Sequence, residues 1–378
     1  MLAAFGCAQP AAPAAPAAAE PAVAEPAAEP AAAAEPAAEA EKPAEEKLTF
    51  SLLVPQLSNV AWRDVADQTQ RFCDDLGVEL IIADAKGNDA TQFDQVTGFC
   101  ASGVDCMILY GNSDAVVESM LDQCTEAKIP TFIGRYPGFT PEEYEGDSYI
   151  AFGNADWKLA GYLQAKALYD AGFRKLVACG GMNGVSVAED RYNGMLQFIE
   201  KHPDMELIQG VRDQETREQG LINIENFLSA FPGPGFDCVW CTNDDTAMGV
   251  LEGLKAAGLN GKIGLGGIDL IPEARQAIKD GDMVFTTFMD PYSASCGSVV
   301  LMYDYLHGFA PDFSDLSSGL LPITKANVDA YEATFVNSVP EIDMQTLSKV
   351  TNPAATTNDL RGVVKSEELP AVTEFPAD

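Results

Sequence analysis

The sequence predicts an α/β protein with two doubly wound parallel-sheet lobes, preceded by a disordered Ala/Pro/Glu tether. Three observations predict it. Short apolar runs alternate with segments of helical period from residue 48 onward, this alternation occurs twice, and residues 8–47 hold 20 Ala, 8 Pro and 8 Glu. Apolar runs without period-two alternation are typical of strands buried on both faces, and such strands occur in parallel sheets covered by helices.

Residues 8–47 are expected to form an extended tether outside any core. The recurring prolines interrupt the helix that the alanines would favour, and the glutamates repel one another. The tether carries 8 Glu against 2 Lys, or −6, so −28 of the formal charge of −34 belongs to the rest of the chain. The acidity is therefore a property of the folded part.

A short apolar run, residues 2–6, leads into Cys7 before the tether. It resembles the end of a bacterial lipoprotein signal, in which the cysteine becomes lipidated, although Phe5 is bulky for such a signal. We therefore expect residues 1–7 to be a signal remnant and the protein to be an extracytoplasmic, membrane-anchored lipoprotein. The alternative is an ordinary mobile terminus with a chance cysteine. The rest of the sequence has no run of about 18 apolar residues, so a membrane-spanning helix is not expected.

The first lobe is predicted from four apolar runs, of which the first three are each followed by a segment with one apolar stripe at helical spacing. The runs lie at residues 48–54, 78–83, 106–110 and 131–134. The pattern begins again in the second lobe, with runs at residues 175–179, 205–210, 237–241, 262–266 and 283–288.

Polar side chains follow these strands in a consistent way. They are Asn59, Asn112, Arg135, Asn154, Asn243 and Asp269. Ligands of open parallel sheets bind beyond the carboxyl ends of the strands. Asn, Arg and Asp offer several hydrogen bonds in a fixed plane, which suits vicinal hydroxyl groups.

The charge and the two histidines exclude several functions. With 57 acidic against 23 basic residues, the surface repels nucleic acid and anionic membranes. Since His202 and His307 are the only histidines, a three-His metal site is impossible. No cofactor or metal is expected, and no catalytic base lies near the predicted ligand site, so an enzyme is not expected.

Five sequence pieces occur together in a characteristic order. They are Leu57-Ser58-Asn59 with Trp62, Gly134-Arg135, the run 188–194 around Arg191, the run 242–245 that contains Asn243, and the run 266–269 that ends at Asp269. Through these five pieces the chain resembles the bacterial extracytoplasmic monosaccharide-binding proteins of the ribose-binding type. The resemblance covers residues 48–335. These are solute receptors of ABC importers with the type I periplasmic binding protein fold.

The resemblance implies a sugar site. Five residues would hydrogen-bond sugar hydroxyls: Asn59, Arg135, Arg191, Asn243 and Asp269. Trp62 would lie against a C–H face of the sugar, and sugars do combine apolar faces with polar edges. The alternatives are that Trp62 is helix core and that Asn59 and Asp269 are caps or turn residues.

The chain departs from the ribose-type pattern at three places. Gly134 stands where that pattern has Asp, Glu215 or its neighbour Gln214 where an aromatic residue is expected, and Met289 where Gln is expected. Ribose itself is therefore not favoured. A sugar acid is an alternative ligand, because Arg135 and Arg191 keep their charge. A neutral sugar or polyol is favoured, because Glu215 and Asp269 balance both arginines.

The resemblance also implies hinge closure around the ligand and delivery to a membrane permease by a monomeric receptor. Crossings near residues 152–154, 289–291 and 321–322 would divide the chain into a first lobe, 48–152 plus 290–320, and a second lobe, 153–289 plus 321–340. The tail, 341–378, would wrap a lobe or remain mobile. The alternative functions are ligand sensing for a chemoreceptor or sensor kinase and, less favoured, sugar metabolism.

Eight cysteines remain besides Cys7, and an exported protein permits disulfides between them. Cys100 and Cys124 are the favoured pair, because they lie on neighbouring predicted helices. Cys238 and Cys241 have C-x-x-C spacing, yet positions i and i+3 of a strand face opposite sides. A zinc or redox site is therefore not expected there.

Overall fold

The computed structural model describes residues 47–233, 235–338, 340–364 and 366–376. The lipidation site predicted at Cys7, and the tether apart from Lys47, lie outside the described residues.

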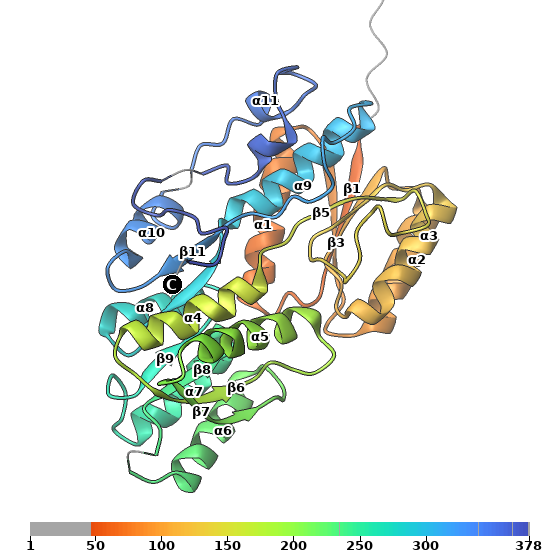
Figure 1. The fold of residues 1–378 in the computed structure, drawn as a ribbon. Coiled ribbons are helices and arrows are strands. Elements are labelled where there is room, and N and C mark those ends of the chain that lie inside the picture. Colours follow the sequence, from red (N-terminus) through yellow and green to blue (C-terminus); the bar gives the residue numbers. More distant parts are fainter. Residues whose placement is uncertain (1–46, 234, 339, 365, 377–378) are drawn as a thin grey trace, which may run out of the picture. The chain divides into compact units, whose positions relative to one another are not determined.

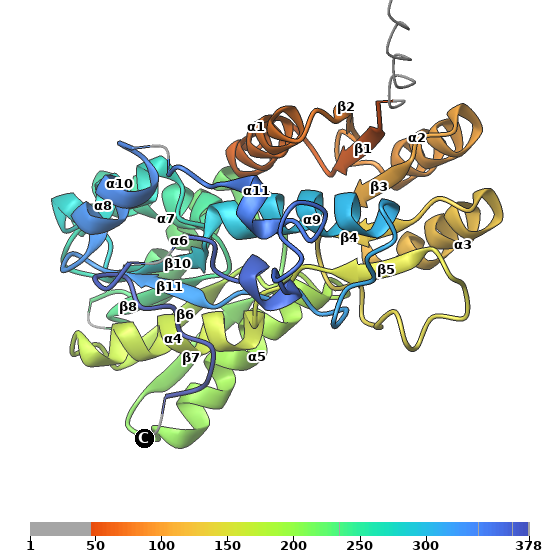
Figure 2. The same ribbon diagram turned by 90° about the horizontal axis from the view of Figure 1, so that it is seen from above.

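The first lobe is built on a parallel sheet of strand order β2-β1-β3-β4-β5. Its strands are β1 (Thr49–Val54), β2 (Glu79–Asp84), β3 (Cys106–Leu109), β4 (Thr131–Ile133) and β5 (Tyr149–Phe152). Its helices are α1 (Val60–Asp75), α2 (Asp89–Ser102), η1 (Asp114–Val116), α3 (Val117–Ala127) and α9 (Pro291–Leu306). Helices α1 and α9 cover one face and α2 and α3 the other (Figure 2). Along β1, Phe50 and Leu52 pack in the cluster of α1 and α9, and Leu53 packs in that of α2 and α3.

The second lobe repeats this plan with the parallel order β7-β6-β8-β9 (Figure 1). Its strands are β6 (Lys175–Cys179), β7 (Glu206–Val211), β8 (Cys238–Cys241) and β9 (Gly264–Gly266). Its helices are α4 (Trp157–Asp170), α5 (Ser186–Lys201), α6 (Arg217–Ala230), α7 (Asp244–Ala256) and α8 (Pro272–Asp280). In β6, Leu176 packs in the cluster of α4 and α5, and Val177 packs in that of α6 and α7. The prediction of two α/β lobes with parallel sheets is confirmed.

The last predicted strand of the second lobe differs from the expectation. The run at 283–288 forms β10 (Thr286–Met289), which pairs antiparallel with β11 (Leu320–Ile323), and a single bridge between Gly266 and Phe285 links it to β9. The strands β5 and β11 were not among the predicted apolar runs. The predicted lobe boundaries stay a prediction.

The chain beyond β11 is packed. It contains α10 (Val328–Phe335), α11 (Met344–Leu347) and η2 (Thr357–Leu360). Three of its apolar side chains, Met344, Leu360 and Leu369, are buried. Of the two expectations for the tail, wrapping is the one observed in the described residues.

All eight cysteines among the described residues have free thiols, so the expected pairing of Cys100 with Cys124 is absent. Cys238 packs on the α4–α5 side of β8, and Cys241 on the opposite side, as the strand period predicted. Within the described ranges, no group of three or more metal-ligating side chains is placed to hold an ion. No described helix is long and apolar enough to span a membrane.

Helices α4 and α5 approach closely through two glycines. A Cβ at Gly161 would lie 1.8 Å from the backbone oxygen of Arg191, and a Cβ at Gly194 would lie 1.8 Å from that of Lys158. Both obstacles are backbone atoms, which cannot rotate away. This close contact fixes where α5 holds the side chain of Arg191.

We predict that Gly194→Ala destabilises the second lobe by about 1–3 kcal/mol or more, since the added methyl forces the two helices apart. Gly98→Ala is the matched control, because Gly98 is exposed in α2 and its Cβ would meet no atom within 4 Å. Alanine there should stabilise the protein by about 0.5–1 kcal/mol through helix propensity. Urea unfolding measures both. Equal stability of the two variants would contradict the predicted contact.

Candidate functional site

On the first lobe, two predicted residues lie at the start of α1. Asn59 is its N-cap, and its side-chain oxygen accepts a hydrogen bond from the backbone N–H of Ala61 at 2.8 Å. Trp62 is half-buried in the first turn, and its ring lies 5.1 Å from that of Tyr110 in an edge-to-face arrangement. The capping alternative therefore holds for the Asn59 oxygen, and Trp62 belongs to an aromatic pair.

Arg135 follows β4 and is held by two groups of its own lobe. Its Nη2 donates to the backbone oxygen of Gly111 at 2.8 Å and lies 3.7 Å from Oδ1 of Asp114. Burial lowers the pKa of Arg135, and the negative charge of Asp114 opposes that shift. The charges of Arg191 and Glu215, both on the second lobe, also act on Arg135. Arg135 of the first lobe therefore lies within electrostatic range of Arg191 and Glu215 of the second.

Gly134, the position without the expected carboxylate, has no room for any side chain. A Cβ there would lie 2.2 Å from the ring of Tyr110. Tyr110 is 4% exposed, and its hydroxyl is buried without a partner among the described residues. The aromatic ring thus occupies the space that a side chain at position 134 would need.

On the second lobe, the predicted residue Arg191 is almost fully enclosed. It is 6% exposed, donates from Nη1 to the backbone oxygen of Thr242 at 2.9 Å, and donates from Nη2 to Oδ1 of Asp269 at 3.0 Å. Its guanidinium carbon lies 4.5 Å from the ring centroid of Trp157. Its Nε is buried and has no partner among the described residues. Two of the three guanidinium nitrogens are therefore paired within the described residues, and the third is not.

Glu215 and Asn243 lie beside Arg191. Oε1 of Glu215 accepts from the backbone N–H groups of Gly181 and Met182 at 3.0 and 3.1 Å and from the hydroxyl of Thr242 at 3.1 Å. Asn243 caps α7 with its side-chain oxygen and donates from Nδ2 to the backbone oxygen of Glu215 at 3.2 Å. Of the two predicted alternatives, Glu215 joins the site, whereas Gln214 is exposed.

Asp269 adopts a strained backbone conformation. Its φ is 126°, and the φ of Leu270 is 60°, in the region that L-residues rarely adopt. Burial raises the pKa of Asp269 to about 6, although the charge of Arg191 and its hydrogen bond oppose the shift. The strained turn holds the carboxylate against the guanidinium.

A second carboxyl group, that of Asp244, lies near the pair of Arg191 and Asp269. Asp244 is fully buried and interacts with the hydroxyl of Thr286 at 3.0 Å and with the backbone N–H of Ile271 at 3.1 Å. Burial and the neighbouring charge of Asp269 raise its pKa to about 8. Asp244 therefore carries a proton at neutral pH, when it can donate as well as accept.

The predicted residue Met289 lies at the end of β10. It is 6% exposed and packs in an apolar cluster that also contains Trp157 and Ile268.

Sequence patterns missed three residues around the site. Trp157 stacks on Arg191, Tyr110 covers Gly134, and Asp114 accepts at Oδ2 from the backbone N–H of Ser186 at 3.2 Å. Since Asp114 belongs to the first lobe and Ser186 begins α5 of the second, this last hydrogen bond joins the two lobes. Their positions in the sequence could have pointed to them. Tyr110 and Asp114 follow β3, and Trp157 follows β5.

The raised pKa values predict how stability depends on pH. Folding takes up protons wherever the native carboxyls hold them more tightly than the unfolded chain does, here from about pH 4 to about pH 8. These groups therefore make the protein less stable as the pH rises through that range, by on the order of a few kcal/mol.

Asp244→Asn should flatten this dependence between pH 6 and 8.5, because the amide cannot ionise. Thermal unfolding at several pH values measures it. If the unfolding temperature of the wild type falls over this interval no more steeply than that of the variant, the prediction is wrong.

Comparison with known proteins agrees with this geometry. Residues 50–309 match the family model of the periplasmic binding protein domain. The ribose import binding protein of Salmonella typhimurium is 28% identical over 247 residues, which are 64% of this chain and 79% of that protein. The galactofuranose-binding protein of Escherichia coli is 30% identical over 224 residues, or 58% of this chain and 70% of that protein.

Among solved structures, a periplasmic solute-binding protein of an ABC transporter from Actinobacillus succinogenes, with bound D-allose, superimposes with a TM-score of 0.68. It is 23% identical, and the alignment covers 75% of this chain and all of that chain. This likeness agrees with the two-lobed fold. By the match of its residues 50–309, this chain belongs to the family of periplasmic binding proteins.

Proposed function

We propose that the protein captures a neutral monosaccharide or polyol between its two lobes and delivers it to an ABC importer. The observation that carries the proposal is the pairing of the site's cations. Arg191 is paired with Asp269, and Arg135 lies beside Asp114. Since Glu215 adds a further carboxylate, the site offers an anionic ligand no unbalanced positive charge. This favours a neutral ligand over the sugar acid.

The polar atoms without partners also suit a sugar. Three buried atoms without a partner among the described residues belong to the site, namely Nε of Arg191, Nε1 of Trp157 and the hydroxyl of Tyr110, and a fourth, Oδ1 of Asn154, belongs to the segment after β5. The first two can only donate, the amide oxygen accepts, and the phenol can do both. A molecule with several hydroxyl groups would satisfy such a mixture, whereas an apolar ligand would leave each atom unsatisfied.

The relatives support the same class of ligand, because the two relatives compared above are named for ribose import and for galactofuranose binding. The family consists of binding proteins, so the protein binds its solute without a chemical step. Closure would follow from contacts that both lobes make to one molecule, which stabilise only the closed form.

The extracytoplasmic location of the family agrees with a lipid anchor at Cys7, which we include in the proposal. Cys7→Ser should move the protein, expressed with its native signal, from the membrane fraction to the soluble fraction. Detergent phase partitioning measures the shift. If the variant partitions as the wild type does, the anchor lies elsewhere or is absent.

A thermal-shift screen tests the ligand class. The panel holds D-ribose, D-galactose, D-allose, myo-inositol, xylitol and D-galacturonate. A ligand at about 100 times its dissociation constant adds about 2.7 kcal/mol to the stability. We expect a neutral member to raise the unfolding temperature. If only the galacturonate does so, the neutral-ligand proposal is wrong.

The role of Arg191 is tested with Arg191→Met. Hydrogen bonds to charged groups contribute about 1.5–3 kcal/mol, so the variant should bind the sugar found in the screen on the order of 100-fold more weakly. Arg217→Met is the matched control, because Arg217 is exposed and pairs with Asp245 and Glu273 on the surface. Titration calorimetry measures both. Equal affinities would remove Arg191 from the site.

A further inference from the structure

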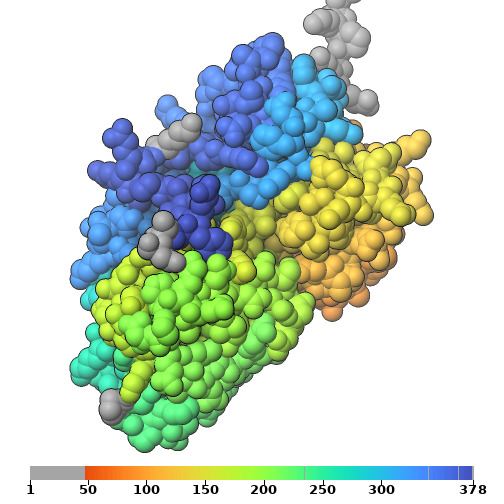
Figure 3. All heavy atoms as spheres, viewed as in Figure 1, coloured from red at the N-terminus to blue at the C-terminus, as the bar shows by residue number. Residues whose placement is uncertain are grey.

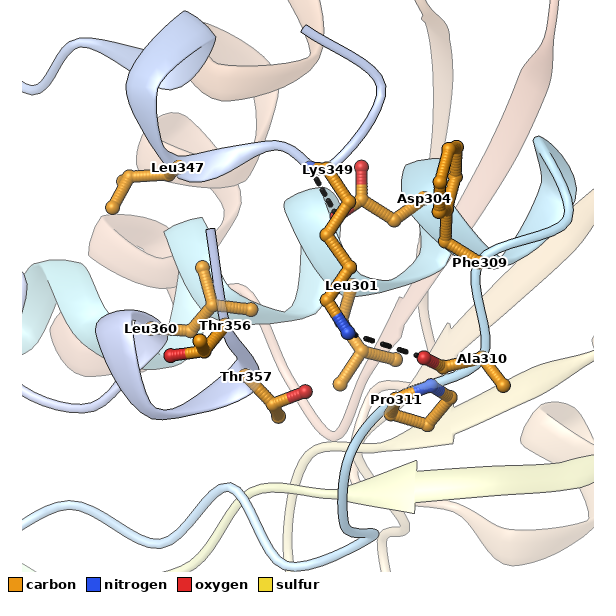
Figure 4. Close-up of a pocket in the computed structure, with 10 residues that line it drawn as sticks. All are labelled: Leu301, Asp304, Phe309, Ala310, Pro311, Leu347, Lys349, Thr356, Thr357 and Leu360. Atoms are coloured by element: carbon orange, nitrogen blue, oxygen red, sulfur yellow. Dashed lines mark hydrogen bonds between the residues drawn. The ribbon is translucent and has the colours of Figure 1, made fainter. Parts of the chain in front are cut away.

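The C-terminal segment, which comprises the described residues 340–364 and 366–376, contacts both lobes. It first packs on the first lobe: Arg71 of α1 donates from Nη2 to the backbone oxygen of Pro340 at 3.0 Å. Lys349 then lies along α9, where its Nζ donates to the backbone oxygen of Ala310 at 3.2 Å and its backbone N–H donates to Asp304 at 2.8 Å (Figure 4). Leu360 lines the same contact.

The segment next binds the chain where it passes from β10 into α9. Oδ2 of Asp290 accepts from the backbone N–H of Val364 at 3.2 Å, and the hydroxyl oxygen of Ser293 accepts from the N–H of Val363 at 3.0 Å. Asp290 is 4% exposed and caps α9. It lies in the predicted hinge crossing at 289–291, so the segment is fixed to a hinge residue.

The segment then passes the third predicted crossing and reaches the second lobe. Val372 and Leu320 exchange two backbone hydrogen bonds, of 2.7 and 2.9 Å, which adds a short antiparallel bridge to the edge of the β10–β11 pair. Phe375 packs edge-to-face on Tyr162 of α4, with ring centroids 5.1 Å apart. Figure 3 shows the dark-blue segment lying between the light-blue region of α9 and the yellow-green region of α4.

We propose that this segment is a strap that positions the hinge and limits how far the two lobes open. After β11 the chain contacts the first lobe at Pro340, and after Val364 it returns to the second lobe, where Phe375 packs on Tyr162. Its contacts with Arg71, Asp290 and Tyr162 therefore anchor the segment on both lobes. Rotation of the second lobe away from the first would separate Phe375 from Tyr162 or Val364 from Asp290.

The strap thereby narrows the range of open conformations. A receptor that is restricted to partly closed states loses less conformational freedom when it binds, which raises its affinity without any contact to the ligand. Val372 and Phe375 are positioning residues in this role. The inference rests on the hinge closure proposed above, but it concerns the ligand-free protein.

Distance measurement between the lobes tests the strap in the full chain. Spin labels on non-natural residues at Glu126 of α3 and Glu225 of α6, both exposed, avoid the native cysteines. Truncation after Val364 removes only the part that reaches the second lobe. In the absence of ligand, we expect a longer mean distance and a distribution roughly twofold broader than that of the wild type.

A matched pair of point variants separates the effect of losing the strap contact from a general effect on folding. Val372→Pro removes the N–H that donates to Leu320, whereas Thr373→Pro changes a neighbour whose N–H has no partner among the described residues. We expect the first to broaden the distribution and the second to leave it unchanged, with similar circular dichroism for both. Distributions identical to the wild type for Val372→Pro and for the truncation would overturn the proposal, whatever sugar the protein binds.

Discussion

The burial of one guanidinium group constrains the rest of the site. Arg191 is almost fully enclosed in a chain whose formal charge is −34. A buried charge costs several kcal/mol in lost hydration unless partners replace the water. Here the partners are the carboxylate of Asp269, the backbone oxygen of Thr242 and the face of Trp157. Each comes from a different element, so β8, α4 and the loop after β9 must all meet α5 at one place.

Two features of the backbone make that meeting possible. Gly161 lets α4 approach the backbone of Arg191 more closely than any other residue would allow. Asp269 is held at a φ of 126° by its turn, and its own N–H donates to the backbone oxygen of Thr287 at 2.9 Å. Conformational strain of this kind persists only where the surroundings determine it. The strained backbone of Asp269 and the absence of a side chain at Gly161 both help to fix the position of the Arg191 guanidinium.

The same contacts connect the site to the hinge and the tail. Thr287 belongs to β10 and donates from its hydroxyl to the backbone oxygen of Leu321 in β11, and the neighbouring Leu320 pairs with Val372. Hydrogen bonds from Asp269 to Thr287, from Thr287 to Leu321 and from the adjacent Leu320 to Val372 therefore link the site to the C-terminal segment. Since opening of the lobes must bend the chain near this pair, the geometry of the site and the constraint on the hinge are parts of one hydrogen-bonded unit.

The sequence by itself determined the fold class, because the alternation of buried strands and amphipathic helices is a local property of the chain. It also indicated Asn243 and Asp269 as neighbours, since each follows a strand at one edge of the second sheet, whereas Arg191 and Glu215 came from the family resemblance. Only the tertiary structure decided that Tyr110 fills the space beside Gly134, that Trp157 stacks on Arg191, and that Val372 pairs with Leu320. These contacts join residues that lie 24 to 52 positions apart. No local pattern specifies them, because they depend on how close two lobes and a returning chain approach once the cores have packed.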